Sequence, residues 1–259
     1  MYFATHEFAR RILNVFRGGS LSGYSQLWAG LFASDPTPTG TAGIEIAYEG
    51  YQRQPIAFSS PSMFNDHLAI RNTQDIVWPI SSQATSPVLH IGIFDERVSG
   101  TMLLRGNLTV PLNIVAGMQP SILAGDVIYW GRGDFSVDFR KMYLNTLRGL
   151  ALPGFTPRMA MFAEDPRQGG FELAGENYSR PEISFAEPHI AENEIMTITN
   201  QSVTQFPVPL DFWGDLTHYA IMIDDTSQIA SVRPATIRGN IHRNYVSNFA
   251  QGTINLRVS

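Results

Sequence analysis

Phe32-Ala33-Ser34-Asp35-Pro36 returns later in the chain as Phe162-Ala163-Glu164-Asp165-Pro166, at an offset of 130 residues (162 − 32). In both copies a short apolar run leads into a turn, because Asp before Pro is biased away from the helical region and Pro presets the turn. A repeat this long corresponds to a whole domain and not to one unit of a solenoid. We therefore expect two similar domains in tandem, and a function that suits a duplicated module.

Further markers recur in the same order on both sides of this pair. Tyr51–Phe58 matches Tyr178–Phe185 at an offset of 127 residues (178 − 51), and His90–Ile93 matches His218–Ile221 at an offset of 128 (218 − 90). The openings match at an offset of 131 (139 − 8), with Phe8, Leu13, Asn14, Arg17 and Gly18 paired to Phe139, Leu144, Asn145, Arg148 and Gly149. Loop insertions would produce such small drifts in the offset.

The predicted boundary lies where the last strand of the first copy meets the helix of the second. We expect a first repeat over residues 1–130, a linker over 131–136 and a second repeat over 137–259. The linker contains Arg132-Gly133-Asp134, for which a chance tripeptide is favoured over integrin adhesion. Each repeat has about 130 residues, which is enough to bury its own core.

The composition is that of a globular protein with few charges. Hydrophobic residues make up 44% of the chain and charged residues only 16%, below the usual ~25%. A surface poor in charge fits a protein that neighbours cover. The net charge of −5 argues against a nucleic-acid partner or an anionic membrane surface, since both need a basic face.

Several classes of site are excluded by what the chain lacks. It has no cysteine, so disulfides, thiolate metal sites and a cysteine nucleophile are excluded. It has no run of 18 apolar residues that could span a membrane. Met1–Glu7 lacks the basic start of a signal peptide and no apolar stretch follows it, so we expect synthesis in a host cytoplasm. We expect no cofactor and no metal.

Each repeat is expected to open with a helix of about ten to twelve residues, which needs tertiary packing to persist. In the first, the apolar stripe at helical spacing consists of Phe8, Ile12, Val15 and Phe16, and Gly18-Gly19 ends it. In the second, Asp138 is the expected cap, Gly149 ends the helix, and the stripe consists of Phe139, Met142, Tyr143 and Leu147.

The remainder of each repeat has the pattern of short strands. They are expected over residues 24–32, 44–48, 54–58, 88–94, 102–104, 126–130, 158–162, 217–223 and 253–258. Short strands with turn signals every 8–12 residues are typical of a β-sandwich or a related barrel. We therefore predict a mainly β protein of two tandem β-sandwich-like domains, each with a short N-terminal helix.

The ordered series of motifs resembles a family of small proteins of tailed bacteriophages, known as tail or tail-fibre-like proteins. The motifs that carry the resemblance are Leu31–Thr37, Gly50–Pro55, His90–Asp95 and Ala124–Asp126. The second repeat is looser, with Met222-Ile223 where Phe-Asp is expected. Typical members resemble one copy of the unit, so the resemblance implies a virion protein in which that unit is duplicated.

Two Tyr-x-Arg pairs are the candidate ligand-binding residues: Tyr51 with Arg53, and Tyr178 with Arg180. Residues i and i+2 of a strand lie on one face, so the ring and the guanidinium could stack and bind a glycan. A structural role is favoured, in which the Arg packs over the ring or pairs with Asp35 or Asp165.

Two other motifs are better explained by structure than by chemistry. His90 and His218 precede strands without a cluster of metal-ligand spacing, which favours part-buried histidines that satisfy backbone groups over a catalytic base or metal ligand. Asp224-Asp225 with Asp215 lacks the spaced ligands of a calcium loop. Neighbouring strand residues also point to opposite faces, so a turn is favoured over a carboxylate pair.

The chain has no phosphate-binding glycine loop, no Gly-x-Ser-x-Gly elbow and no His-Glu-x-x-His. We therefore expect no enzyme, and a glycan-degrading tail enzyme is a weak third hypothesis. The leading hypothesis is a structural protein of the phage virion, forming a homo-oligomer with other virion proteins in the tail, the tail tip or fibre attachment region, or on the head. The alternatives are a receptor module that binds a host-surface glycan and a head decoration protein.

Overall fold

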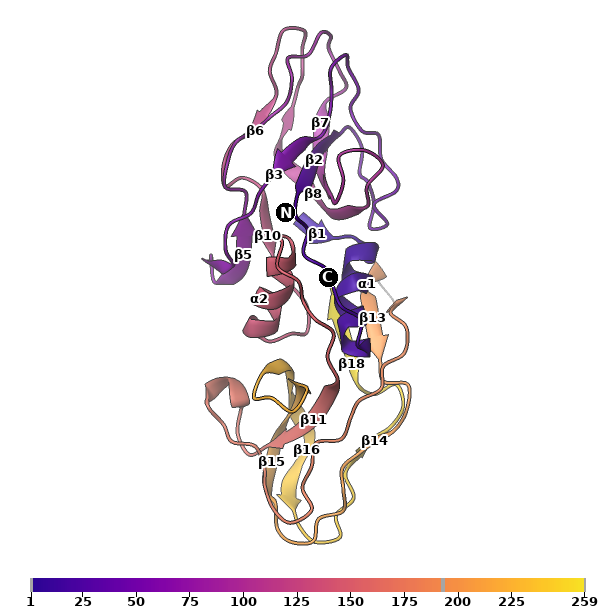
Figure 1. Cartoon of the computed structure of the whole chain (residues 1–259), viewed down its shortest axis with the longest axis vertical. Coiled ribbons are helices and arrows are strands. Elements are labelled where there is room, and N and C mark those ends of the chain that lie inside the picture. Colours follow the sequence, from indigo (N-terminus) through magenta and orange to yellow (C-terminus); the bar gives the residue numbers. More distant parts are fainter. Residues whose placement is uncertain (1, 192–193, 259) are drawn as a thin grey trace.

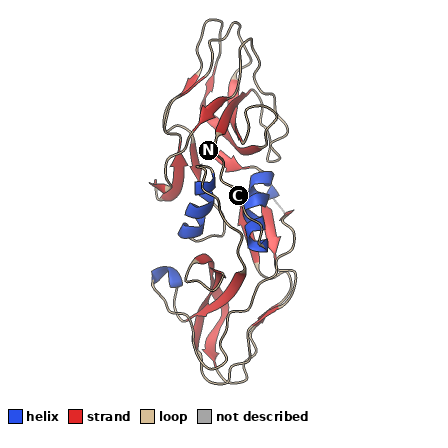
Figure 2. Ribbon diagram, in the orientation of Figure 1, coloured by secondary structure: helices blue, strands red, loops and turns tan. Residues whose placement is uncertain are grey.

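The computed structural model describes residues 2–191 and 194–258 as an elongated molecule with loops at both ends (Figure 1). Strands account for 38% of the residues and helices for 10%, which confirms the predicted mainly β class. The two α-helices lie side by side near the middle of the molecule, and the strands extend from there toward both ends (Figure 2).

The first half of the chain, residues 2–130, builds one large sheet that curls into a half-barrel. Its eight strands have the order β3-β2-β7-β8-β1-β10-β5-β4. Their bounds are β1 Tyr2–Ala4, β2 Leu27–Phe32, β3 Gln54–Ile56, β4 Ser62–Phe64, β5 His67–Arg71, β7 Val88–Phe94, β8 Met102–Leu112 and β10 Ile128–Trp130. β1 runs parallel to β10, and the other neighbours are antiparallel. A separate ladder joins β6 (Ile76–Val77) to β9 (Ser121–Ile122).

The second half, residues 137–258, divides its strands among three smaller sheets. The first contains β11 (Pro157–Phe162), β15 (Gly214–Ile223) and β16 (Ile229–Ile241). The second contains β12 (His189–Ile190), β13 (Met196–Thr199) and β18 (Asn255–Val258), and the third pairs β14 (Thr204–Gln205) with β17 (Asn248–Phe249). A short 3-10 turn, η2 (Pro166–Gln168), follows the Asp-Pro turn.

Each half begins with a capped helix, as predicted. α1 spans His6–Asn14, is capped by the Thr5 side chain and continues as the 3-10 turn η1 (Val15–Arg17), which ends at a left-handed Gly18. α2 spans Val137–Thr146. Its cap is Ser136, whose Oγ accepts from the Phe139 N–H at 3.0 Å, so the prediction that Asp138 caps this helix is wrong. Asp138 lies in the first turn, where a negative charge also favours the helix N-terminus.

The predicted strand over residues 44–48 is not formed. Only Glu45 makes a bridge, to Phe32, although Ile46 and Tyr48 are buried as their alternation suggests. Alternation records which side chains face the core, and a loop that lies on the core satisfies the same pattern. β8 extends beyond the predicted strand over residues 102–104 and ends at Leu112. The side chains of this extension are mostly exposed, so no pattern of apolar residues indicates it in the sequence.

Each helix packs against both halves of the chain. α1 contacts β8 of its own half and also β13 and β18 of the second half. In return, α2 contacts β16 of its own half and β5 of the first. The ring of Phe16 lies at the centre, with its centroid 5.0–6.0 Å from the ring of Phe135 in the linker and from three rings of the second half, those of Phe139, Phe155 and Phe185. One hydrophobic cluster therefore runs through both halves.

The two halves also contact each other through reciprocal pairs of residues. Leu21 and Leu152, which differ by the same 131 positions as the helix markers (152 − 21), form a backbone bridge with each other. The Arg17 Nε donates to the Phe185 carbonyl at 3.4 Å, and the Arg148 Nε donates to the Phe58 carbonyl at 3.4 Å. In each case a residue of the first half contacts the second half as its equivalent in the second half contacts the first. Such reciprocal contacts are typical of an isologous, approximately twofold interface.

Candidate functional site

The first Tyr-x-Arg pair meets at Glu45. The Tyr51 hydroxyl donates to Glu45 Oε1 at 3.1 Å and accepts from the Leu31 N–H at 2.8 Å. The Arg53 Nε and Nη2 donate to the two Glu45 oxygens at 3.0 and 2.9 Å, a bidentate ion pair. The same guanidinium covers the ring of Phe94, 3.3 Å from its centroid.

The second pair repeats this arrangement around Glu172. The Tyr178 hydroxyl donates to Glu172 Oε1 at 2.8 Å and accepts from the Met161 N–H at 3.1 Å. The Arg180 Nε and Nη2 donate to the Glu172 oxygens at 2.8 and 2.6 Å, and its Nη1 donates to the Thr226 carbonyl at 2.7 Å. Glu45 and Glu172 lie 127 positions apart (172 − 45), so the triad itself follows the repeat.

Burial controls the ionisation of both tyrosines. Desolvation raises the pKa of Tyr51 and of Tyr178 well above the usual value, and the neighbouring Glu carboxylates raise it further. The hydrogen bond and charge of Glu172 likewise raise the pKa of Arg180. Each triad therefore holds a neutral hydroxyl beside a closed ion pair, an arrangement suited to fixing the loop onto β2 or β11.

The arginine partners differ from those expected. The sequence suggested Asp35 or Asp165, but Asp35 pairs with Arg105 at 3.0 Å and Asp165 pairs with Arg167 at 2.6 Å. The sequence signal for the true partner is the recurrence of Glu45 as Glu172. These two residues lie outside the segments that match at the sequence level, such as Tyr51–Phe58 and Tyr178–Phe185. Ligand binding by the two Tyr-x-Arg pairs stays a prediction.

His90, His218 and Asp134 all have intramolecular partners. Nδ1 of His90 lies 2.9 Å from Asn107 Oδ1 and that of His218 lies 2.8 Å from Thr217 Oγ1, so these partners are side chains and not the expected backbone groups. Asp134 of the Arg-Gly-Asp tripeptide binds Arg257 at 3.0 Å. Within residues 2–191 and 194–258, no three His, Asp or Glu side chains are grouped as metal ligands.

The two neighbouring aspartates lie in the turn after β15. Asp224 Oδ1 accepts from the Thr156 N–H at 2.8 Å, and Asp225 pairs with Arg158 at 3.1 Å. The two carboxylates thus have separate structural partners, which agrees with the expected turn.

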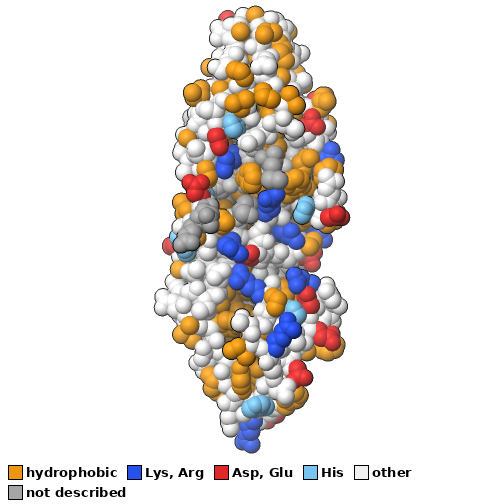
Figure 3. Space-filling view, turned by 180° about the vertical axis from the view of Figure 1, so that it is seen from behind, with side chains coloured by type: hydrophobic (Ala, Val, Ile, Leu, Met, Phe, Trp, Pro, Cys, Tyr) orange, Lys and Arg blue, Asp and Glu red, His pale blue; other side chains and the backbone are white. Residues whose placement is uncertain are grey.

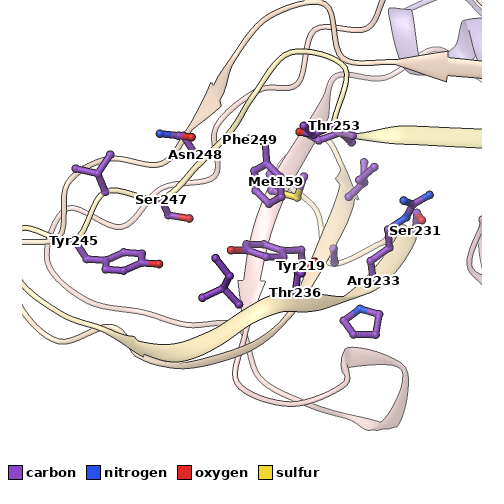
Figure 4. A pocket seen from close by; sticks show the side chains of 16 residues that line it. Met159, Tyr219, Ser231, Arg233, Thr236, Tyr245, Ser247, Asn248, Phe249 and Thr253 are labelled. Carbon is purple, nitrogen blue, oxygen red and sulfur yellow. The ribbon is translucent and has the colours of Figure 1, made fainter.

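Each half of the chain contains one of two cavities. One, of about 410 Å³, lies between β16 and β17 and is lined by three aromatic side chains, those of Tyr219, Tyr245 and Phe249 (Figure 4). The other, of about 580 Å³, lies between β8 and β9 and is lined by aliphatic side chains, among them Leu108, Val110, Leu112 and Ile122, together with the rings of Tyr2 and Trp130. β8 and β9 correspond in chain order to β16 and β17.

Residues 4–129 match the family model described as podophage GP4 fiber I protein gp80. This segment is similar to a family of phage fibre proteins. The match spans all four motifs that suggested a tailed-phage relative, and it ends one residue before the predicted end of the first repeat. The description of this family names a fibre protein of a podophage.

No curated protein matches the chain. In the described residues, no helix combines the length and the apolar character needed to cross a membrane.

Proposed function

We propose that this chain is a structural subunit of a phage tail fibre, and that its two halves act as one unit built like a symmetric dimer. The reciprocal bridge between Leu21 and Leu152 carries this proposal, because equivalent residues meet only where two like halves are related by a twofold axis. The match of residues 4–129 to a phage fibre family supplies the setting.

The interface between the halves has the character of a core. Domains joined by small polar interfaces move relative to each other by default, whereas large apolar interfaces hold them in place. Here Phe16 is buried among rings of the second half, and α1 lies against β13 and β18. A unit held together in this way keeps its shape along its length, as a fibre component requires.

Assembly with neighbours would use the exposed apolar side chains outside this core. Ile80 and Val115 are 60% and 56% exposed on first-half loops, and Phe212 is 58% exposed on a second-half loop. Figure 3 shows hydrophobic side chains at the surface toward both ends of the molecule. In a homo-oligomer, many copies of such a surface bind at once, so the assembly is held firmly even where each single contact is weak.

Removing the chain from the phage tests this proposal. Particles from a phage that lacks the coding region should lose fibre density in electron micrographs, and a wild-type copy supplied in the host should restore it. Mass spectrometry of purified particles should find the chain in the wild type. Complete fibres on particles without the chain would overturn the proposal.

A further inference from the structure

We propose that the cavity between β16 and β17 is a saccharide-binding site. The site is separate from both Tyr-x-Arg triads and adds recognition to the structural role. It does not depend on that role, because the cavity and its lining alone support it.

The cavity has the size and shape of a small-ligand site. Its volume of about 410 Å³ lies within the ~300–1,000 Å³ typical of ligand pockets. The hydroxyl groups of Tyr219 and Tyr245 point toward each other across the cavity, and Ser247 lies between them (Figure 4). The ring of Phe249 packs edge-on against that of Tyr219, with centroids 4.6 Å apart, and holds it in place.

The lining combines the two chemistries that a sugar ring needs. A pyranose has an apolar C–H face, which packs on an aromatic ring, and a rim of hydroxyls, which needs donors and acceptors. Tyr219 and Tyr245 provide rings and hydroxyls, and Asn248 and Thr253 also line the cavity with an amide and a hydroxyl. Tyr219 is hydrogen-bonded to Ser247, so one of its polar partners is already positioned.

One end of the cavity is positively charged. Arg233 lines it and pairs with Asp134 at 3.1 Å. Asp134 also pairs with Arg257 at 3.0 Å, so two guanidinium groups share one carboxylate. The excess positive charge favours a saccharide that carries a carboxylate or phosphate group at this end.

Tyr219, Tyr245 and Phe249 have no aromatic equivalents at the corresponding positions of the first half, whose cavity has its own rings from Tyr2 and Trp130. By the offsets of the repeat, the first half has Ile91, Met118 and Ile122 where the second has Tyr219, Tyr245 and Phe249 (219 − 91 = 128; 245 − 118 = 127; 249 − 122 = 127). The backbone is shared, since the Tyr245 N–H donates to the His242 carbonyl and the Met118 N–H donates to the Val115 carbonyl, both at 3.0 Å. Aliphatic side chains therefore suffice at these three positions of the fold, and a ligand would give the three rings a role beyond their packing against the core.

Two tryptophan variants at matching positions test the site. Thr236 lines the cavity between β16 and β17, and Thr109 lines the cavity between β8 and β9, 127 positions away (236 − 109); both side chains are exposed. A microbial glycan array is the probe, followed by calorimetric titration of the best-bound free saccharide. Circular dichroism checks that each variant is folded.

The wild type should bind a subset of the array, with acidic saccharides preferred. Thr236→Trp and Tyr245→Ala should weaken the binding by about tenfold or more, because they fill the cavity or remove a ring. Thr109→Trp should bind like the wild type. Absence of binding above background, undiminished binding by Thr236→Trp, or an equal loss in Thr109→Trp would each overturn the proposal. None of these results bears on the fibre role, which is tested on particles.

Discussion

Leu21 and Leu152 pair with each other through their backbones, the N–H of each donating to the carbonyl of the other at 2.8 Å. The two residues hold the same place in the two halves, 131 positions apart (152 − 21). Around them, the Tyr24 N–H donates to the Thr146 carbonyl at 2.8 Å, while Phe155 donates to Val15 at 3.4 Å. Each of these hydrogen bonds has an equivalent between the corresponding residues of the other half. Substitutions at equivalent positions should therefore lower the free energy of unfolding by similar amounts.

The glycines beside this bridge allow the two backbones to approach. A Cβ at Gly23 would collide with the backbone of Gly149, and a Cβ at Gly154 would collide with the backbone of Gly18. Gly23→Ala and Gly154→Ala should therefore each lower the free energy of unfolding by about 3 kcal/mol or more, as severe overpacking does. Urea denaturation measures both values.

Gly169→Ala is the matched control for these two variants. Gly169 has a left-handed φ of 86°, but no atom lies within 4 Å of its added Cβ. Gly169→Ala should lower the free energy of unfolding by only about 1–2 kcal/mol, because alanine is unfavourable in the left-handed backbone conformation. If Gly23→Ala proved no more costly than this control, the close contact between the halves would be refuted.

Phe16 should couple the unfolding of the two halves. Replacing it with alanine removes contacts with one ring of the linker and three rings of the second half, and should lower the free energy of unfolding by about 3–5 kcal/mol. The wild type should unfold in one step, with equal calorimetric and van't Hoff enthalpies. Phe94→Ala is the comparison, because Phe94 belongs to a separate small cluster of the first half. Two resolved transitions in the wild type would contradict a shared core.

The two Glu-centred triads should contribute similarly. Glu45→Gln and Glu172→Gln each leave an arginine without its carboxylate, and the Arg53 and Arg180 side chains are only 14% and 18% exposed. The free energy of unfolding of each variant, measured by urea denaturation, should be about 1–3 kcal/mol lower than that of the wild type. The matching Tyr→Phe changes provide a double-mutant cycle in each half. A loss in one half with none in the other would show that the triads do not share a structural role.

Stability should fall at alkaline pH. Burial raises the pKa of Tyr51, Tyr129, Tyr143 and Tyr178 in the folded chain far above the unfolded value of about 10. Their neutral forms stabilise the fold fully below that value, and this contribution is lost progressively as the pH rises above it. In a titration followed by tyrosinate absorbance, these residues should ionise only as the chain unfolds. Ionisation of all nine tyrosines near pH 10 in a chain that stays folded would contradict their burial.

The sequence predicts local secondary structure better than it predicts which elements pack against each other. Phe8, Ile12, Val15 and Phe16 are buried as the helical stripe requires. The stripe cannot show that it faces strands of the other half, because an apolar face specifies burial and not its partner. Likewise, spacing within the chain relates Tyr51 to Arg53, but Glu45 joins them through a loop that has the alternation of a strand. The saccharide cavity depends on rings from separate strands and loops, which only the fold brings together.

The location of the chain on the phage particle tests the fibre role most directly. The measurement is cryo-electron microscopy of particles in which this chain carries a gold-labelled tag on an exposed loop. We predict that the label lies on the tail fibres, and that the fibre density shows units with two like halves. Label confined to the head, or particles without any label, would contradict the proposed function.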